Sequence, residues 1–175
     1  TTGTQNAALG KAALAANTEG NYNTAIGPYA LNDNTTADNN TGVGHEALAK
    51  NTTGTENVAV GQGALDANTT AGNNTAVGRM ALSANTTGGN NTGLGHQALI
   101  LNTTGADNVS VGKNSLAANI DGAQNVAVGS EAMKTATSDD GAVVVGYLAG
   151  RDMNGATHTT LLGSYAGLQL TTGDK

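Results

Sequence analysis

A 17-residue repeat runs through the whole chain and constrains its fold more than any other feature. Self-similarity at a short fixed period is the sequence signature of solenoids, in which each repeat forms one coil that stacks on the next. The repeat is marked without a single insertion by a glycine that follows an aliphatic residue, at Gly10, Gly27, Gly44, Gly61, Gly78, Gly95, Gly112, Gly129, Gly146 and Gly163. Each residue is therefore best described by its position within the repeat.

The repeat divides the chain into three regions when units are counted from Asn6, with the consensus Asn-Thr-Ala-Val-Gly-x-x-Ala-Leu-x-x-Asn-Thr-Thr-Gly-x-x. Residues 1–5 form the end of a preceding repeat, residues 6–124 seven regular repeats, and residues 125–175 three divergent repeats. Terminal repeats of a solenoid are atypical because they cap it or join another segment, so we interpret residues 125–175 as a transition or a cap. A chain that begins inside a repeat, without Met, is expected to be a fragment or a processed product.

The composition excludes several common classes of protein. The 175 residues include no Phe, Trp or Cys and only 4 Tyr, whereas Gly alone contributes 26, and Thr and Asn are the most abundant polar types. An aromatic-centred core, a disulfide scaffold and a thiolate metal site are thereby excluded. The net charge of −6 and the single, scattered basic residues argue against nucleic acid as a partner. No apolar run approaches the roughly 20 residues that cross a membrane, so membrane insertion is not expected.

The local sequence favours strands over helices. Asn, Thr and Gly are poor helix formers, and the segments between them are shorter than the about 12 residues of a stable helix. We therefore predict an all-β fold, a parallel β-solenoid or β-roll of ten 17-residue coils, with short extended pieces at Thr-Ala-Val, Ala-Leu and Thr-Thr of each unit. Coils stacked at about 4.8 Å would make a rod on the order of 50 Å long.

The Asn and Gly positions are predicted to shape the corners of each coil. Asn tolerates a left-handed backbone and bonds its own turn, and stacked Asn side chains would form amide ladders like those of cross-β assemblies. An invariant Gly suggests a positive φ or a close approach of backbones. The predicted turn and ladder residues are Asn23, Gly27, Asn40, Gly44, Asn57, Gly61, Asn74, Gly78, Asn91, Gly95, Asn108 and Gly112, and the Asn at position twelve forms a second set of corners.

Aliphatic residues at positions four and nine are predicted to form the core. Neighbours along a strand point to opposite faces, and positions three and eight are small, so both faces of the strands are non-polar. Two aliphatic residues per coil are few for a lone rod, which leads us to expect self-association, with the small Ala files letting backbones approach. The predicted core residues are Val43, Leu48, Val60, Leu65, Val77, Leu82, Leu94 and Leu99.

Several segments of the repeat resemble known fibrous proteins. Asn23–Gly27, Asn57–Gly61 and Asn125–Gly129 are similar to the Asn-Ser-Val-Ala-Ile-Gly motif of trimeric autotransporter adhesin heads, and the fuller unit Asn74–Gly88 resembles repeat arrays in bacteriophage tail fibres. The resemblance covers essentially the whole chain. It implies a left-handed β-roll assembled as a parallel homotrimer, with a role in adhesion or host recognition.

The polar residues do not suggest catalysis. His45 and His96 share a position but lie three units apart, about 15 Å along the rod, too far to bind one metal within a chain. The carboxylates show no repeating pair for acid–base chemistry, and every glycine is accounted for by the repeat. We therefore expect no enzyme activity, no metal and no cofactor.

The Thr pairs are the candidate ligand surface, for a host glycan or, as an alternative, for ice. Adjacent Thr residues point to opposite sides of a strand, so only one file can face a ligand. Asn-x-Thr sequons at Asn34 and its equivalents, and at Asn39, Asn73 and Asn90, would allow glycosylation in a suitable host. The candidate surface residues are Thr36, Thr53, Thr70, Thr87 and Thr104.

Together these features predict a non-enzymatic, extracellular structural or adhesion segment. It would be the shaft of a phage tail fibre or of a cell-surface adhesin that presents a receptor-binding element, with itself as partner in a homotrimer. A self-assembling extracellular filament and an ice-binding protein are the alternatives.

Overall fold

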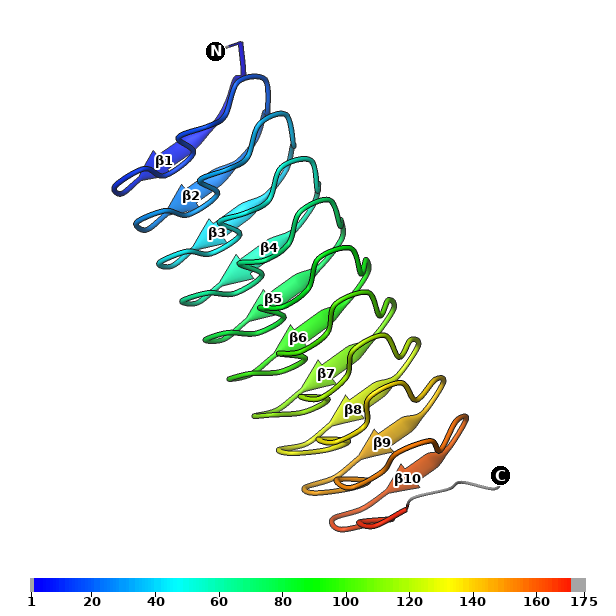
Figure 1. Ribbon diagram of the computed structural model, residues 1–175. Helices are drawn as coiled ribbons and strands as arrows, with labels where there is room; N and C mark the ends of the chain where they lie inside the picture. The colour runs from blue at the N-terminus through cyan, green and yellow to red at the C-terminus, as the bar shows by residue number, and fades with distance from the viewer. Residues whose placement is uncertain (1, 171–175) are drawn as a thin grey trace.

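A computed structural model describes residues 2–170 of the chain, and these form a rod of stacked coils (Figure 1). The fold is an all-β parallel β-solenoid, which confirms the predicted fold class, and no helix is present within the described residues. Residue 1 of the preceding repeat and residues 171–175 of the last divergent repeat lie outside them. Each coil contributes one strand of three residues: β1 (Ala7–Leu9), β2 (Thr24–Ile26), β3 (Thr41–Val43), β4 (Val58–Val60), β5 (Thr75–Val77), β6 (Thr92–Leu94), β7 (Val109–Val111), β8 (Val126–Val128), β9 (Val143–Val145) and β10 (Thr160–Leu162).

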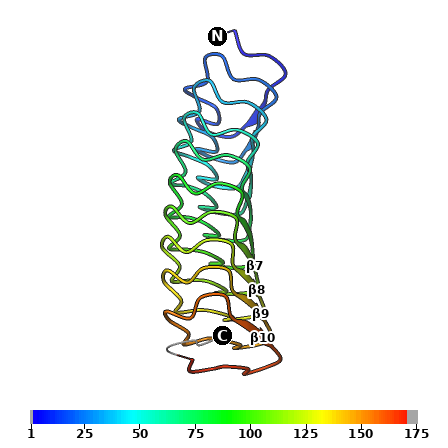
Figure 2. The same cartoon turned by 90° about the vertical axis from the view of Figure 1, so that its right-hand side faces the viewer.

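The ten strands form a single parallel sheet in chain order. Each residue pairs with its equivalent one repeat later, as Thr75 pairs with Thr92 and Val77 with Leu94. The sheet forms one side of the rod and continues without a break from β1 to β10 (Figure 2). The divergent repeats thus add coils to the same stack in the same register.

Only one of the three extended pieces predicted in each coil is a strand. The Ala-Leu and Thr-Thr pieces lie in turns and bends, so that part of the prediction is wrong. The chain turns at the Ala-Leu piece because positions seven and nine have a left-handed backbone, with φ of 56° at Met80 and 53° at Leu82. For a residue with a side chain this conformation costs roughly 1–2 kcal/mol. Backbone hydrogen bonds to the adjacent coils offset that cost, from Met80 N to Gln62 O at 2.9 Å and from Leu82 N to Ala98 O at 2.9 Å.

The interior of the rod is filled by small residues at positions three and eight and by Leu at position nine. Ala76, Ala81 and Leu82 of the fifth coil are fully buried. The predicted core residues at position nine, Leu48, Leu65, Leu82 and Leu99, are likewise fully buried.

The prediction that position four belongs to the core is wrong. Val77 and Leu94 are 38% and 37% exposed, and Val43 and Val60 are half-buried. Residues two and four of each unit point outward because residue three points inward, and the interior beside the position-nine Leu has room only for a small side chain. A Cβ added at Gly93 would already lie 3.3 Å from Leu82 Cδ1.

The same finding corrects the predicted role of the small Ala files. Ala59, Ala64, Ala76 and Ala81 are fully buried inside their own chain, so they are not available to another copy. They allow close packing within a coil. The bulky aliphatic file, not the small one, faces outward.

The last two coils fill the same interior with the side-chain sizes exchanged. Position nine becomes Gly150 and Gly167, while position three becomes Val144 and Leu161. A Cβ added at Gly150 would lie 3.2 Å from Leu161 Cδ1 and 3.4 Å from Val144 Cγ1. In these two coils the large side chain at position three thus fills the space that Leu at position nine fills in the other coils.

This exchange predicts that Leu161→Ala destabilises the last coils by roughly 1–2 kcal/mol, below the usual range for a fully buried Leu because Leu161 is half-buried. No position-nine side chain is there to refill the space. Hydrogen exchange of residues 140–168 would measure the loss. Leu162→Ala is the matched control, since Leu162 is 70% exposed and points outward. Equal losses of stability in Leu161→Ala and Leu162→Ala would contradict the conclusion that Leu161 replaces the side chain missing at position nine.

Candidate functional surfaces

The described part of the chain offers surfaces and not a cavity. Residues 2–170 contain no pocket and no group of three or more His, Cys, Asp or Glu side chains placed to hold a metal ion. The same residues include no helix long and apolar enough to cross a membrane.

The outer sheet face carries most of the exposed large hydrophobic side chains of the described rod. We define it as the outward side chains at positions two and four of β1 to β10. Position two is mostly Thr or Val, whereas position four is always aliphatic. Ile26, Val58 and Val143 are 41%, 36% and 38% exposed. The complete file at position four is Leu9, Ile26, Val43, Val60, Val77, Leu94, Val111, Val128, Val145 and Leu162.

A basic edge borders this face where the strands end. We define it as Lys11, His45, Arg79, His96 and Lys113, all at position six. The residues are scattered in the sequence, but their spacings are multiples of 17, so they lie along one line of the rod. Neighbouring side chains on this line touch: Arg79 Nε donates to Gln62 Oε1 at 3.1 Å, and Arg79 Nη1 lies 3.4 Å from His96 Nε2.

The N-terminal part of the basic edge includes aromatic contacts. Lys11 Nζ lies 5.4 Å from the centre of the Tyr29 ring, a cation–π distance, and Tyr29 meets the His45 ring edge to face at 6.1 Å. His45 Nδ1 also lies 3.4 Å from Glu46 Oε2. The His residues therefore pair with their neighbours, and His158 lies apart, beside Gly141.

An acidic edge borders the opposite side of the face, where the strands begin. We define it as Asp38, Glu56, Asp107 and Asp140, at positions sixteen and seventeen. Asp38 Oδ1 accepts a hydrogen bond from Asn21 N at 2.6 Å, and Asp140 Oδ1 accepts one from Ala123 N at 2.7 Å. Within residues 2–170, positions sixteen and seventeen carry no Lys or Arg. The outer sheet face thus has opposite charges along its two long edges.

The Asn residues predicted as ladder residues are buried and form the amide ladders. At position one, Asn74 N donates to Asn57 Oδ1 at 3.0 Å, and the Asn74 side chain donates to Gly88 O at 3.0 Å. At position twelve, Asn68 Nδ2 donates to Asn51 Oδ1 at 2.9 Å. The buried members at position one are Asn23, Asn40, Asn57, Asn74, Asn91, Asn108 and Asn125.

The conformation predicted for these Asn residues is wrong. Left-handed backbone occurs at positions seven, nine and seventeen, not at positions one and twelve. The Asn side chains point into the coil, where they satisfy backbone groups that would otherwise be buried without partners. The predicted Gly residues, Gly27, Gly44, Gly61, Gly78, Gly95 and Gly112, combine φ of 130–140° with close backbone approach to the next coil.

The sequons fall into two structural groups. The amides of Asn34, Asn51, Asn68, Asn85 and Asn102 are fully buried in the second ladder, so the folded rod cannot carry sugars there. Asn39, Asn73 and Asn90 are exposed at position seventeen, next to the acidic edge. N-linked glycans at the Asn-x-Thr sites of the folded protein are therefore restricted to this exposed group.

The Thr pairs divide between structure and surface. At position thirteen the hydroxyl is half-buried and bonds to the next coil, as Thr69 Oγ1 donates to Thr86 O at 3.2 Å. At position fourteen the side chain is exposed. The exposed file is one residue wide and consists of Thr36, Thr53, Thr70, Thr87 and Thr104.

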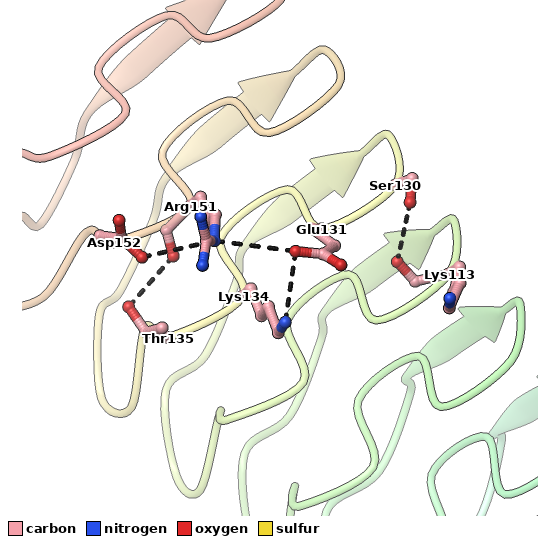
Figure 3. Close-up of polar contacts among 7 residues, drawn as sticks. All are labelled: Lys113, Ser130, Glu131, Lys134, Thr135, Arg151 and Asp152. Carbon is pink, nitrogen blue, oxygen red and sulfur yellow. Dashed lines mark hydrogen bonds and ion pairs between the residues drawn. The ribbon is translucent and has the colours of Figure 1, made fainter.

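A group of ion pairs joins the eighth and ninth coils (Figure 3). Glu131 Oε2 lies 3.2 Å from Lys134 Nζ and 3.7 Å from Arg151 Nε, and Arg151 Nε lies 3.6 Å from Asp152 Oδ1. The two positive charges balance the two negative ones, and partly exposed pairs of this kind contribute about 1 kcal/mol or less each. The group connects coils and leaves no net charge to bind a ligand.

No family model, no curated protein and no solved structure matches this chain. A fold alone does not define a function, so functional conclusions depend on the rod and the surfaces described above.

Asp139 is a buried carboxyl that the sequence reasoning missed. It occupies position fifteen, where the regular repeats have Gly or Ala, and is fully buried. Its Oδ1 accepts a hydrogen bond from Ala156 N at 2.6 Å, while Oδ2 has no partner among the described residues. Burial raises the pKa of this carboxyl above its ordinary value, bonds from the backbone of Ala156 and Gly155 lower it, and the charge of Asp140 raises it.

We expect acidification to stabilise the last coils through Asp139. Because its pKa is higher in the folded state, the folded chain binds the proton more readily between the ordinary pKa of 3.8 and the raised value. Stability therefore falls as the pH rises through that window and returns as the pH is lowered. Denaturation of the wild type and of Asp139→Ala from neutral pH to about pH 4 would measure the difference. Identical pH dependence in both proteins would contradict this role.

Proposed function

We propose that this chain is a non-enzymatic fibrous segment, the extracellular shaft of a phage tail fibre or of a cell-surface adhesin. Its task is mechanical, to hold a receptor-binding element away from an anchor. The observation that carries the proposal is the unbroken 17-residue register of ten parallel strands in one sheet. Nine spacings of about 4.8 Å make the stack roughly 43 Å long.

The hydrogen bonding between coils supports a role as a stiff spacer. Strands, turns and Asn side chains all bond to the adjacent coil, as in the bonds of Gln97 N to Arg79 O at 3.0 Å and of Asn102 Nδ2 to Asn85 Oδ1 at 2.9 Å. Bending the rod would stretch several of these bonds at every coil. A repeat that contacts only its two neighbours also lets the length of the rod change with the number of units.

We further propose that the shaft is a parallel homotrimer, with host-surface glycan as a further partner along its Thr and Asn surface. The similarity of the repeat to adhesin heads and tail-fibre arrays motivates the trimer, and the aliphatic file left outside the rod supports self-association.

Light scattering of the purified chain tests the assembly. A trimer has three times the 17.1 kDa mass of the chain. Small-angle X-ray scattering would give the length of the same particle, which the shaft requires to be elongated along the stack. A monomer of 17.1 kDa at all concentrations would overturn the trimer, and a globular particle would overturn the shaft.

The ice-binding alternative has one supporting observation, the exposed file of Thr at position fourteen. A file one residue wide covers little of an ice plane, so we expect no thermal hysteresis. Measurable hysteresis with faceted crystals would establish ice binding, and micrometre-long fibres in electron micrographs would establish the filament.

A further inference from the structure

The outer sheet face is apolar and accessible to solvent. Aliphatic side chains at position four stand in one continuous line, and several are more than a third exposed, including Ile26, Val77 and Leu94. Apolar patches of roughly 300–600 Å² on soluble proteins are often sites of interaction. A three-residue width over ten strands gives this face a footprint of roughly 400 Å².

The two edges show what kind of partner fits the face. The basic edge follows the ends of the strands and the acidic edge precedes their beginnings, so in a parallel sheet they lie on opposite sides along the whole rod. A surface with an apolar centre and opposite charges on its two sides is complementary to another copy of itself.

The charges also select one orientation of the two copies. Parallel rods related by rotation about an axis along the rod bring the basic edge of one copy beside the acidic edge of the next. Antiparallel rods bring like edges together. Parallel packing therefore pairs opposite charges, and antiparallel packing opposes like charges.

The positions of the charges fit copies that lie at the same height. Lys113 and Asp107 flank the same strand, β7, and His45 and Asp38 flank β3. Arg79 follows β5, one coil from the level of Glu56, which precedes β4. When two parallel copies pack in register, these basic residues of one copy therefore lie opposite the acidic residues of the other at similar heights along the rod.

The area of the contact is sufficient once the edges are included. The apolar strip alone is smaller than the about 800 Å² per partner of a stable interface. Including both edges roughly doubles the width of the footprint and brings it to about 800 Å².

We propose that the outer sheet face is the surface through which copies of this chain assemble, with rods parallel and in register and the basic edge of each copy against the acidic edge of the next. This inference rests on the proposed self-assembly, and adds the interface and the pairing of its charged edges. The residues predicted to form the core at position four form the interface instead.

Edge-reversal variants test the orientation. Arg79→Glu with Lys113→Glu reverses two charges of the basic edge, and Glu56→Lys with Asp107→Lys reverses two charges of the acidic edge. Each double variant is expected to weaken association at least tenfold, as measured by analytical ultracentrifugation, and the variant with all four substitutions is expected to recover it. Position six holds Pro, Gln, Ser and Tyr in other coils, and position seventeen holds Tyr, Asn and Gln, so these substitutions should leave the coil intact. Circular dichroism would verify the fold.

A substitution on the face itself tests the apolar part. Val77→Lys, at the centre of the outer sheet face, is expected to abolish association. Thr87→Lys is the matched control, because Thr87 belongs to the same coil and is exposed away from the strand. It should assemble like the wild type.

The outcomes separate this inference from the proposed trimer. A wild type that assembles, with all edge and face variants assembling equally well, would overturn this interface and leave the trimeric shaft standing. Loss of association in one double variant without recovery in the fourfold variant would overturn the parallel orientation. A monomeric wild type would overturn both proposals.

Discussion

Gly78→Ala is expected to destabilise the rod by about 3–5 kcal/mol, the sum of a strained backbone and an overpacked contact. A Cβ at this position would lie 2.5 Å from Gly95 O and 2.6 Å from Gly95 C, in the next coil. These are backbone atoms, and Gly95 N is bonded to Val77 O at 2.8 Å, so the coil cannot move away without breaking the ladder. The φ of 135° at Gly78 is itself strongly unfavourable for alanine.

Gly63→Ala is the matched control for this prediction. Gly63 also has a positive φ, 63°, but a Cβ there would approach only Met80 Cγ, at 3.8 Å. Equivalent positions in other coils hold Glu46 and Met80 at similar φ. We expect a loss of roughly 1–2 kcal/mol, the cost of left-handed backbone alone, measured by chemical denaturation beside Gly78→Ala. Similar losses in both variants would show that close contact between coils does not explain the invariant glycine.

The stacking of coils could be predicted from the sequence because a constant repeat length fixes which residues of adjacent coils pair. An invariant Gly once in every repeat identifies both the coil and a point where adjacent coils approach closely. The amide ladders followed from the same period. The inward direction of the Asn side chains could not be predicted in the same way. Asn tolerates left-handed backbone, and this led to the prediction that the Asn residues form corners. In the structure their side chains instead satisfy buried backbone groups.

The inside and outside of the strand could not be assigned from alternation alone. Alternation separates position three from position four but does not say which one faces inward. The choice depends on the left-handed turn at position nine, which directs Leu82 and its equivalents into the coil. One signal was present: position three enlarges to Val144 and Leu161 in the coils where position nine becomes Gly, as expected only if the two share a space.

The charged edges were missed for a related reason. Counted along the chain, Lys11, Arg79 and Lys113 are isolated, but they share position six, as Glu56 and Asp107 share position seventeen. In a solenoid, residues one or more whole repeats apart are neighbours along the rod. Charge in such a protein has to be summed by repeat position before a patch is excluded.

Asn74→Ala is expected to destabilise the rod by about 2–4 kcal/mol, because it removes the partner of a buried backbone group. Asn74 Oδ1 accepts the hydrogen bond of Asn91 N at 2.9 Å, and this N–H would have no replacement inside the coil. Gly88 O would lose the Asn74 amide but keep the bond from Asn85 Nδ2 at 2.9 Å. The loss therefore comes mainly from one orphaned N–H and from the space that the amide leaves.

Asn73→Ala, one residue away, separates the ladder from the general preference for Asn in this chain. Asn73 is exposed with φ of 61°, so its replacement is expected to cost less than about 1 kcal/mol. Hydrogen exchange should then show faster exchange of the Asn91 amide in Asn74→Ala and no change there in Asn73→Ala. If Asn91 stayed protected in Asn74→Ala, the amide ladder would be a consequence of the coil's shape. If its protection were lost, the ladder is one of the interactions that hold adjacent coils together, as the proposed shaft requires.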